Sequence, residues 1–582
     1  MYKYKFLVAA VGFFFLSTVY NCGASNEKGS PLPSADTGHT PVSAEGGGEA
    51  PNDTPPEDTA QGIKTKTEPE NEAPKEKGSP VDKEASIQAG TDQRSEGEQS
   101  ADAQSETEEK REIDAQREPT WRSRGDRKPD EWLSKLFKIA SEAPSRKDKA
   151  ALKDVLDNPK KFRFQLVITE FDPSRALNDQ LKTHAYRVDH EYLYPASAIK
   201  IFGSIAALRS MTLHTEAHPW MDIDDHMSNP KRPQGCHAKD KTNIAGGYVS
   251  LHQEIKKTQL VSSNEAFNAV FNFTGFRELH EHIMPDFPSV RVHHRLSSRE
   301  THEESLVTPL LHVCDRDTQG EKKSNPQELK RAKFTSKKSI SDLEKRLPKG
   351  APRGFESSKK SLKNVGKAYV DMKTREMIKK PMDFTLKNRV SLFDLQRVMM
   401  GMVLDGRDTP LGPSVSLLSS PKEGEKAMIN PQWLDALRHS MAIYPRHSKN
   451  PIYDGKSLSE TRFKPLIRGV RRGLDKEERD LYYLNKAGKA LGFHLDSAFI
   501  ATGEGVGNVD KAGRPGGAVK KGVFVTLGLY INDDEIINND HYEYSKISVP
   551  LFNALGYAIG RILRDAKEAN AESGAEGSVR TH

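Results

Sequence analysis

Between residues 24 and 118 the chain contains no Phe, Trp or Tyr, which limits where a hydrophobic core can form. The same stretch carries 23 Asp and Glu against 10 Lys and Arg, a net charge of −13, amid many Pro, Gly, Ser and Thr residues. Such a sequence lacks the apolar surface whose burial would offset roughly 1–2 kcal/mol of backbone entropy per residue. We therefore predict a disordered acidic linker over residues 23–118, with folded structure only beyond it.

The rest of the chain is basic. The formal charge of +6 over 582 residues combines +2 on residues 1–22 with −13 on the linker, which leaves +17 on residues 119–582. A basic surface can meet nucleic acid, anionic lipid or an acidic cell-wall polymer, and charge alone does not choose between them.

The first 22 residues indicate export. Lys3 and Lys5 form a positive segment, and the apolar run over residues 6–20 is too short to span a bilayer comfortably. The run leads into Asn-Cys-Gly, which resembles a bacterial lipobox with Cys22 as the lipidated residue, although the two residues before the cysteine are larger than usual. A plain secretory signal and an uncleaved anchor are the alternatives. We predict a protein anchored by lipid to a bacterial membrane, facing the periplasm or cell surface, with no nucleic-acid partner.

The chain has three cysteines. If Cys22 is lipidated, Cys236 and Cys314 remain as one potential disulfide. Two separate buried thiols are the alternative, because a sequence does not say whether two Cα atoms come within about 7 Å.

Beyond residue 119 the apolar residues recur at the periods of helices and strands. We expect helices at 129–143, 196–211, 262–283 with a break at Thr274-Gly275, 390–404 and 549–569, and strands at 161–172, 185–195, 480–503 and 522–532. This order predicts an α/β plus all-α architecture in which one sheet is assembled from both ends of the chain.

The segment Ser197-Ala198-Ile199-Lys200 opens one of these helices and is the first candidate for chemistry. Positions three apart share a helix face, so the Lys200 amine can lie beside the Ser197 hydroxyl. A serine becomes a good nucleophile when a base takes its proton, and a lysine can serve when burial or a second cation lowers its pKa. This tetrad alone is common by chance.

Two further segments strengthen it: Ser262-Ser263-Asn264 at the head of a helix, and Lys486-Ala487-Gly488 on a strand. Each has a plain structural interpretation, since Ser and Asn are good helix N-caps and a lysine on an edge strand discourages aggregation. The three segments together, in this order, are far more specific than any one of them.

The stretches YPASAIK, LVSSNEAFN and NKAGKALGFHLDSAFI resemble the S-x-x-K, S-D-N and K-T-G motifs of class A β-lactamases and related penicillin-binding proteins. The resemblance covers about residues 130–570, with a poor match at 285–385. It implies the β-lactamase/penicillin-binding (transpeptidase-like) fold, an antiparallel five-stranded sheet flanked by helices, here as a serine β-lactamase-like domain over 119–570 and a disordered tail over 571–582.

Carried over by motif, Ser197 is the nucleophile that becomes acylated, and Lys200 takes or relays its proton. Ser262 and Lys486 complete the proton path, and Lys486 also attracts a substrate carboxylate. The substrate-binding positions are Asn264, Ala487, Gly488 and Lys489, with the backbone N–H groups of Ser197 and Lys489 as the oxyanion hole. The resemblance implies no metal and no cofactor.

Three positions depart from the family pattern. Ser263 stands where the family has Asp, a largely structural position. Ala487 replaces Thr or Ser, which removes a hydroxyl that helps to bind the substrate carboxylate and implies weaker β-lactam recognition. The deacylating Glu of the E-x-x-L-N pattern has no counterpart, because Glu303-Glu304-Ser305-Leu306 is only a partial echo. An acyl-enzyme could therefore persist.

Residues 320–381 carry 19 Lys and Arg against 7 Asp and Glu. We predict a solvated, partly disordered basic insertion, with contact to an anionic wall polymer or lipid head groups as the alternative. The histidines and aspartates between His214 and His226 are interrupted by Pro219 and predict no metal site. His280 and His282 are expected at the surface.

These features predict an exported serine hydrolase that forms an acyl-enzyme on Ser197, with β-lactams or peptidoglycan-type amides and esters as substrates. A D,D-peptidase or esterase of the penicillin-binding type is the second hypothesis. A non-catalytic, cell-wall-associated lipoprotein that retains the fold is the third.

Overall fold

The computed structural model describes residues 127–228, 236, 238–298, 300–315, 327–329, 345, 362–404, 428–453, 458–475 and 480–576. The export segment with Cys22, the acidic linker and most of the basic insertion lie outside these residues. No helix in the described ranges is long and apolar enough to cross a membrane.

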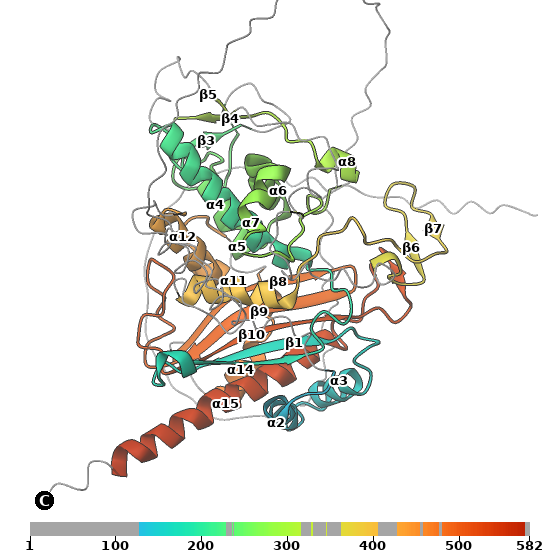
Figure 1. Cartoon of the computed structure of the whole chain (residues 1–582), viewed down its shortest axis with the longest axis vertical. Coiled ribbons are helices and arrows are strands. Elements are labelled where there is room, and N and C mark those ends of the chain that lie inside the picture. Colours follow the sequence, from blue (N-terminus) through green and yellow to red (C-terminus); the bar gives the residue numbers. More distant parts are fainter. Residues whose placement is uncertain are drawn as a thin grey trace, which may run out of the picture. The chain divides into compact units, whose positions relative to one another are not determined.

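A five-stranded antiparallel sheet in the order β2-β1-β10-β9-β8 lies at the centre of the described structure (Figure 1). Its strands are β1 (Gln165–Phe171), β2 (Leu181–Tyr186), β8 (Leu481–Ala490), β9 (Phe493–Thr502) and β10 (Lys521–Tyr530). The chain enters the sheet with two strands and returns to it some three hundred residues later with three. The predicted sheet, built from both ends of the chain and flanked by helices, is confirmed.

Helices cover one face of this sheet: α2 (Glu131–Ala140), α3 (Arg146–Asp157), α14 (Ile467–Leu474) and α15 (Ser548–Glu576) (Figure 1). Alternate strand residues face them, so Leu166 and Ile168 belong to the core under these helices while Val167 belongs to the core on the opposite face. The sheet therefore separates two hydrophobic cores.

Helices α14 and α15 approach each other through glycines. A Cβ atom at Gly473 would lie 2.1 Å from the carbonyl oxygen of Tyr557, and one at Gly560 would lie 2.4 Å from that of Val470. No side chain larger than hydrogen fits between the two backbones at these positions, so the glycines set the distance between the helices.

A larger helical layer covers the opposite face. It consists of η3 (Ala196–Ile199), α4 (Lys200–Ala217), α5 (Leu251–Leu260), α6 (Asn264–Thr274), α7 (Phe276–Ile283), α11 (Leu392–Leu404) and α12 (Pro431–Ala442). Helix α11 packs directly on β1, β9 and β10. Helix α4 is buried without a break from Lys200 to Met211, which makes it the central helix of this layer.

Short elements complete the described structure. They are η2 (Leu177–Asp179), α8 (His302–Ser305), η5 (Pro445–His447), α13 (Glu460–Phe463), the sheet of β3 (His226–Met227), β4 (Leu311–Cys314) and β5 (Gln327–Leu329), and the sheet of β6 (Ala368–Val370), β7 (Met377–Ile378) and β11 (Ile536–Ile537). Cys236 forms a disulfide with Cys314, with 5.9 Å between the Cα atoms. The pairing that the sequence left open is thus present.

Three boundaries differ from the prediction. The second strand ends at Tyr186 instead of continuing through 185–195, because Arg187 and Asp189 adopt positive φ angles of 57° and 59° that break an extended chain. Helix α15 continues to Glu576, past the expected end at 569, through a stretch rich in the helix formers Ala and Glu. The last part of the basic insertion, residues 362–381, is folded and contributes β6 and β7.

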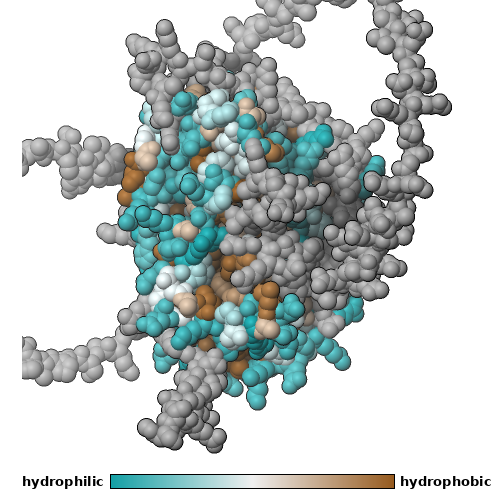
Figure 2. Space-filling view, turned by 60° about the vertical axis from the view of Figure 1, so that its left-hand side comes forward, coloured by the Kyte–Doolittle hydropathy of each residue, from teal (hydrophilic) through white to brown (hydrophobic). Residues whose placement is uncertain are grey.

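Figure 2 shows one face of the molecule, where hydrophilic residues dominate and hydrophobic residues gather in separate patches. Such a mixed surface is ordinary for a globular protein, because polar groups alone cannot cover it.

Candidate active site

The Ser197 segment forms the turn that leads into the central helix. Ser197 lies in η3, and α4 begins three residues later at Lys200. Ala196, just before the serine, has a φ angle of 46°, a conformation that residues with a side chain rarely adopt. Strained backbone of this kind is often found at functional sites.

Strand β8 runs against this turn, and Gly488 makes the approach possible. A Cβ atom at position 488 would lie 2.2 Å from the carbonyl oxygen of Pro195 and 2.8 Å from the backbone nitrogen of Ala198. Only glycine allows β8 to pass so close to the serine. This contact is the physical reason for a glycine at the third position of Lys486-Ala487-Gly488.

The Lys200 amine is fully buried, with 0% of the residue exposed. Its Nζ donates to the Asn264 Oδ1 at 2.8 Å, to the Ser262 Oγ at 3.3 Å and to the Ser262 carbonyl oxygen. Burial lowers the pKa of Lys200 well below its usual value, and the nearby Lys486 cation lowers it further. Burial thus favours the neutral form of the amine, which is the form that can accept a proton.

Lys486 also reaches the Ser262 hydroxyl. It lies on β8, the edge strand of the sheet, yet only 3% of the residue is exposed. Its Nζ donates to the Ser262 Oγ at 2.8 Å. Burial lowers the pKa of Lys486 to about 7, against the opposing effect of the Asp496 carboxylate. The alternative interpretation of this residue as a solvated edge charge is wrong.

Ser262, Ser263 and Asn264 make different contacts. Ser263 caps α6 by accepting a hydrogen bond from the backbone N–H of Ala266 at 3.1 Å, so the N-cap interpretation holds for this serine. Ser262 precedes the cap with a φ angle of 57° and presents its hydroxyl to both lysines. Asn264 is the first residue of the helix and binds Lys200.

Most of the predicted site residues line one small cavity of about 190 Å³, whereas the fully buried Lys200 does not. Its walls include the predicted site residues Ser197, Ser262, Asn264, Lys486, Ala487, Gly488 and Lys489. Within the described part of the chain, the Ser197 hydroxyl has no hydrogen-bond partner, and the described residues that line the cavity include no Asp or Glu. The predicted nucleophile thus faces a cavity whose described ionisable lining residues are Lys, Arg and His.

The Glu303-Glu304 pair does not line this cavity as described. Glu304 instead closes a capping box at the start of α8, where its carboxylate accepts from the Thr301 backbone N–H at 2.6 Å and its own N–H donates to the Thr301 hydroxyl. The partial echo of the family's glutamate is therefore explained by a local helix cap.

Behind the cavity lies a buried polar network that sequence patterns did not reveal. Lys464 donates to the Tyr483 carbonyl oxygen at 2.7 Å and to the Asn485 Oδ1 at 3.3 Å, and both Lys464 and Asn485 line the cavity. The Asn485 amide donates in turn to Asp496 at 2.8 Å. Burial raises the pKa of Asp496 to about 6. The signal in the sequence was weak, because Lys464 belongs to no motif.

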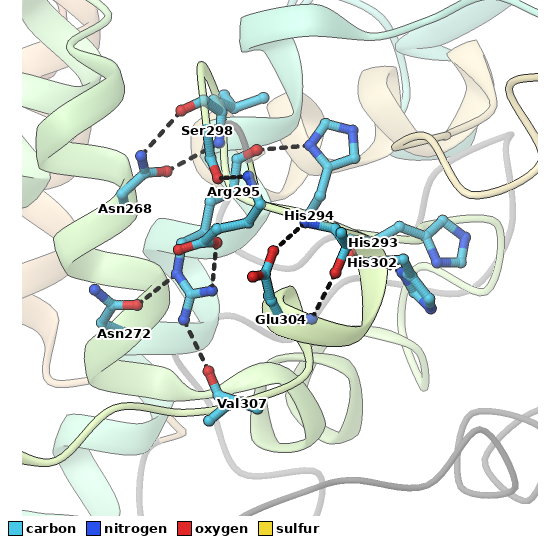
Figure 3. A network of polar contacts seen from close by, with 12 residues as sticks. Asn268, Asn272, His293, His294, Arg295, Ser298, His302, Glu304 and Val307 are labelled. Atoms are coloured by element: carbon cyan, nitrogen blue, oxygen red, sulfur yellow. Dashed lines mark hydrogen bonds and ion pairs between the residues drawn. The ribbon is translucent and has the colours of Figure 1, made fainter. Parts of the chain in front are cut away.

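An asparagine ladder on α6 connects the cavity to the loop formed by residues 291–298 and 300–307. Figure 3 shows two members of this ladder, Asn268 and Asn272, beside the loop. Asn264, Asn268 and Asn272 recur every four residues and so share one face of the helix. The Asn264 Nδ2 donates to the Ser297 hydroxyl at 2.6 Å, and the Asn268 side chain exchanges two hydrogen bonds with the Leu296 backbone, each 2.9 Å. The ladder holds the loop beside the site.

Arg295 fixes the same loop from its other end. Its guanidinium donates to Asn272 at 2.7 Å, to Glu300 at 2.9 Å and to the Val307 carbonyl oxygen at 3.0 Å (Figure 3). The planar guanidinium of Arg295 thus joins α6 to two parts of the loop.

Two expectations about histidines are resolved. His280 is completely buried, which corrects its predicted surface position. Its Nδ1 donates to the Phe276 carbonyl oxygen at 2.8 Å, its Nε2 accepts from the Val292 backbone N–H at 3.1 Å, and burial lowers its pKa to about 4. In the His214–His226 stretch, Asp224 pairs with His252 and His226 stacks on Tyr248.

No protein-family model and no curated protein sequence matches the chain. Solved structures do show similarity. A β-lactamase from Xanthomonas campestris pv. campestris is 12% identical, with 72% of this chain and 98% of that chain covered and a TM-score of 0.33. A β-lactamase from Streptomyces albus G is 12% identical, with 72% and 100% covered and a TM-score of 0.32. A class A β-lactamase from Mycobacterium abscessus is 12% identical, with 71% and 98% covered and a TM-score of 0.31.

Identities of 12% concern the fold and not the activity.

Proposed function

We propose that the protein is a serine acyl-transfer enzyme in which Ser197 is acylated by an amide or ester substrate. The observation that carries this proposal is the convergence of two buried amines, from Lys200 and Lys486, on the Ser262 hydroxyl at the wall of the cavity that Ser197 lines. Burying a charged amine costs free energy unless it is paired and hydrogen-bonded. A lysine whose pKa is lowered by burial is suited to proton transfer.

The roles combine the motif assignments with the contacts of Ser262, which both lysine amines reach. Ser197 Oγ attacks the acyl carbonyl while the neutral Lys200 amine accepts the hydroxyl proton. The oxyanion of the tetrahedral intermediate is stabilised by the backbone N–H groups of Ser197 and Lys489. The intermediate then collapses, and the leaving group takes its proton from the Ser262 hydroxyl, which regains one from the adjacent lysine amines.

The substrate class is anionic and carries an amide or ester bond. Lys486 and Lys489 both line the cavity, which supports recognition of a carboxylate such as that of a β-lactam or a peptide C-terminus. Hydrolysis of a β-lactam and peptide or ester transfer share the same acylation step, and they differ in how fast the acyl-enzyme decays.

The test is acylation of the full-length protein by two reagents, a fluorescent penicillin and a neutral fluorophosphonate, followed by intact mass. We expect wild type to gain one adduct per chain and Ser197→Ala to gain none. Ser440→Ala is a matched control, because Ser440 also lines the cavity but hydrogen-bonds only within its helix. It should label like wild type.

Lys200→Arg tests the base. Arginine keeps a positive charge and cannot accept the proton, so the labelling rate should fall by about 10²–10⁴-fold with the fold intact by circular dichroism. Equal labelling of wild type and Ser197→Ala would reject the nucleophile assignment. The half-life of the penicillin adduct then separates rapid hydrolysis from a stable penicillin-binding complex.

A further inference from the structure

A second hollow opens beside the cavity of Ser197. It has a volume of about 710 Å³, against about 190 Å³ for the cavity itself. The two share Leu260, Ser440 and Ile443 as lining residues, so they adjoin at the C-terminal ends of α5 and α12. Pockets that hold ligands of ordinary size measure roughly 300–1,000 Å³, a range that the hollow reaches and the cavity does not.

The hollow combines an apolar floor with a basic rim. Leu481 and Tyr483 from the first half of β8 lie on the floor, upstream of the Lys486 motif on the same strand. Lys449 and Lys511, which are exposed and which we call the rim lysines, also line the hollow, as does the half-buried Lys256 from α5. The three amines come from segments far apart in the sequence.

Around the hollow, the positive charges of the lysines outnumber the negative charges of carboxylates. In the part of the chain that the structure describes, Lys449 and Lys511 are exposed and make no ion pair. Asp510 is the one carboxylate among the described lining residues, and it accepts the backbone N–H of Arg514 at 2.8 Å. Cations gathered around a concave apolar surface attract an anion that also offers apolar contact.

We propose that this hollow is an extended substrate subsite that binds an acidic, peptide-like arm of the substrate whose scissile bond reaches Ser197. The inference rests on the proposed function for its catalytic end, but the subsite itself is defined by the hollow and its lysines. It makes the substrate larger than a bicyclic β-lactam and gives it at least two separate anionic groups, one at Lys486 and Lys489 and one at the rim.

Binding is tested without chemistry by using Ser197→Ala and fluorescence anisotropy of two labelled tetrapeptides, Glu-Glu-Glu-Glu and Gln-Gln-Gln-Gln. We expect the glutamate peptide to bind about tenfold more tightly at low salt, and the preference to shrink as salt is added. Lys449→Gln/Lys511→Gln should abolish the preference. Lys147→Gln/Lys149→Gln is the matched control, because these exposed lysines lie on α3 and are not among the described residues that line the hollow.

Labelling of wild type by the fluorophosphonate then connects the hollow to the nucleophile. Added glutamate peptide should slow labelling of wild type and leave labelling of Lys449→Gln/Lys511→Gln unchanged. Equal binding of the two peptides, or binding that does not slow labelling, would overturn the subsite. Failure of wild type to be labelled at all would instead reject the proposed function, while the anisotropy result would still report on the hollow.

Discussion

Lys200 and Lys486 are long cationic side chains placed where water scarcely reaches, and their pKa values follow from that placement. A protonated amine loses hydration energy on burial, so the neutral form becomes more favourable. The two cations also repel each other across Ser262, and this repulsion lowers the pKa of Lys200 further. At the scale of single residues, the site is thus an arrangement that releases protons easily.

The Lys486 pKa of about 7 predicts how acylation depends on pH. Below pH 7 the amine is protonated and attracts an anionic reagent, and above pH 7 it is neutral and does not. The rate with penicillin, divided by the rate with the neutral fluorophosphonate, should therefore fall as pH rises from 6 to 9. Rates of intact-mass labelling across this range measure the ratio, in which the contribution of Lys200 cancels.

Lys486→Arg supplies the control, since arginine keeps its charge throughout this range and should flatten the ratio. A wild-type ratio that stays constant from pH 6 to 9 would contradict the assigned role of Lys486, whether or not the arginine variant folds.

At the scale of elements, the contact between α14 and α15 is the tightest packing of two helices that the described structure offers for mutation. On helix propensity alone, Gly473→Ala should stabilise the protein by about 1 kcal/mol. The added methyl group would instead lie 2.1 Å from the Tyr557 carbonyl oxygen, so the helices must separate. We expect a net loss of about 1–3 kcal/mol in the free energy of unfolding, measured by urea denaturation.

Arg472→Ala, at the neighbouring position of α14, is the comparison. Its side chain is 39% exposed, and its contact with Asp148 is long, at 3.7 Å. The free energy of unfolding should change by less than about 1 kcal/mol. A Gly473→Ala protein as stable as wild type would show that the helices adjust at no cost.

The disulfide between Cys236 and Cys314 fastens another element pair, since it ties the segment near β3 to β4 across 78 residues of sequence. Closing a loop of this length restricts the unfolded chain, which predicts a loss of about 2–4 kcal/mol for Cys236→Ser/Cys314→Ser. Thermal unfolding with and without dithiothreitol measures it. Wild type should drop to the level of the variant under reduction, whereas an unresponsive wild type would mean that the bond contributes little.

At the scale of the whole molecule, the predicted lipid anchor at Cys22 and the acidic linker lie outside the described residues, and they remain predictions. If Cys22 is lipidated, the protein should partition into the detergent phase of Triton X-114 and stay with membranes in high salt. Cys22→Ala should move it to the aqueous phase, while Cys236→Ser/Cys314→Ser should not. Release of wild type by salt alone would point to electrostatic attachment of the basic domain.

Some features could be predicted from the sequence because they depend on neighbouring residues. Apolar periodicity located the helix break at Gly275 and the helical segment that begins near Ser197. It also located the strand-forming stretch 480–503, which the structure divides into two strands at Leu491-Gly492. The order of these elements sufficed for the α/β plus all-α architecture and for a sheet made from both ends of the chain. The three motif segments could also be recognised in the sequence, since each spans only three or four consecutive residues.

Other features depended on residues that are distant in the sequence, and only the tertiary structure decided them. Lys486 meets Ser262 across 224 positions, so neither its burial nor its lowered pKa follows from its own strand. The same reason applies to the Cys236–Cys314 bond, to His280 in the core and to Lys464 behind the cavity. Periodicity records which side of an element is apolar, whereas burial of a polar group is set by what the rest of the chain packs against it.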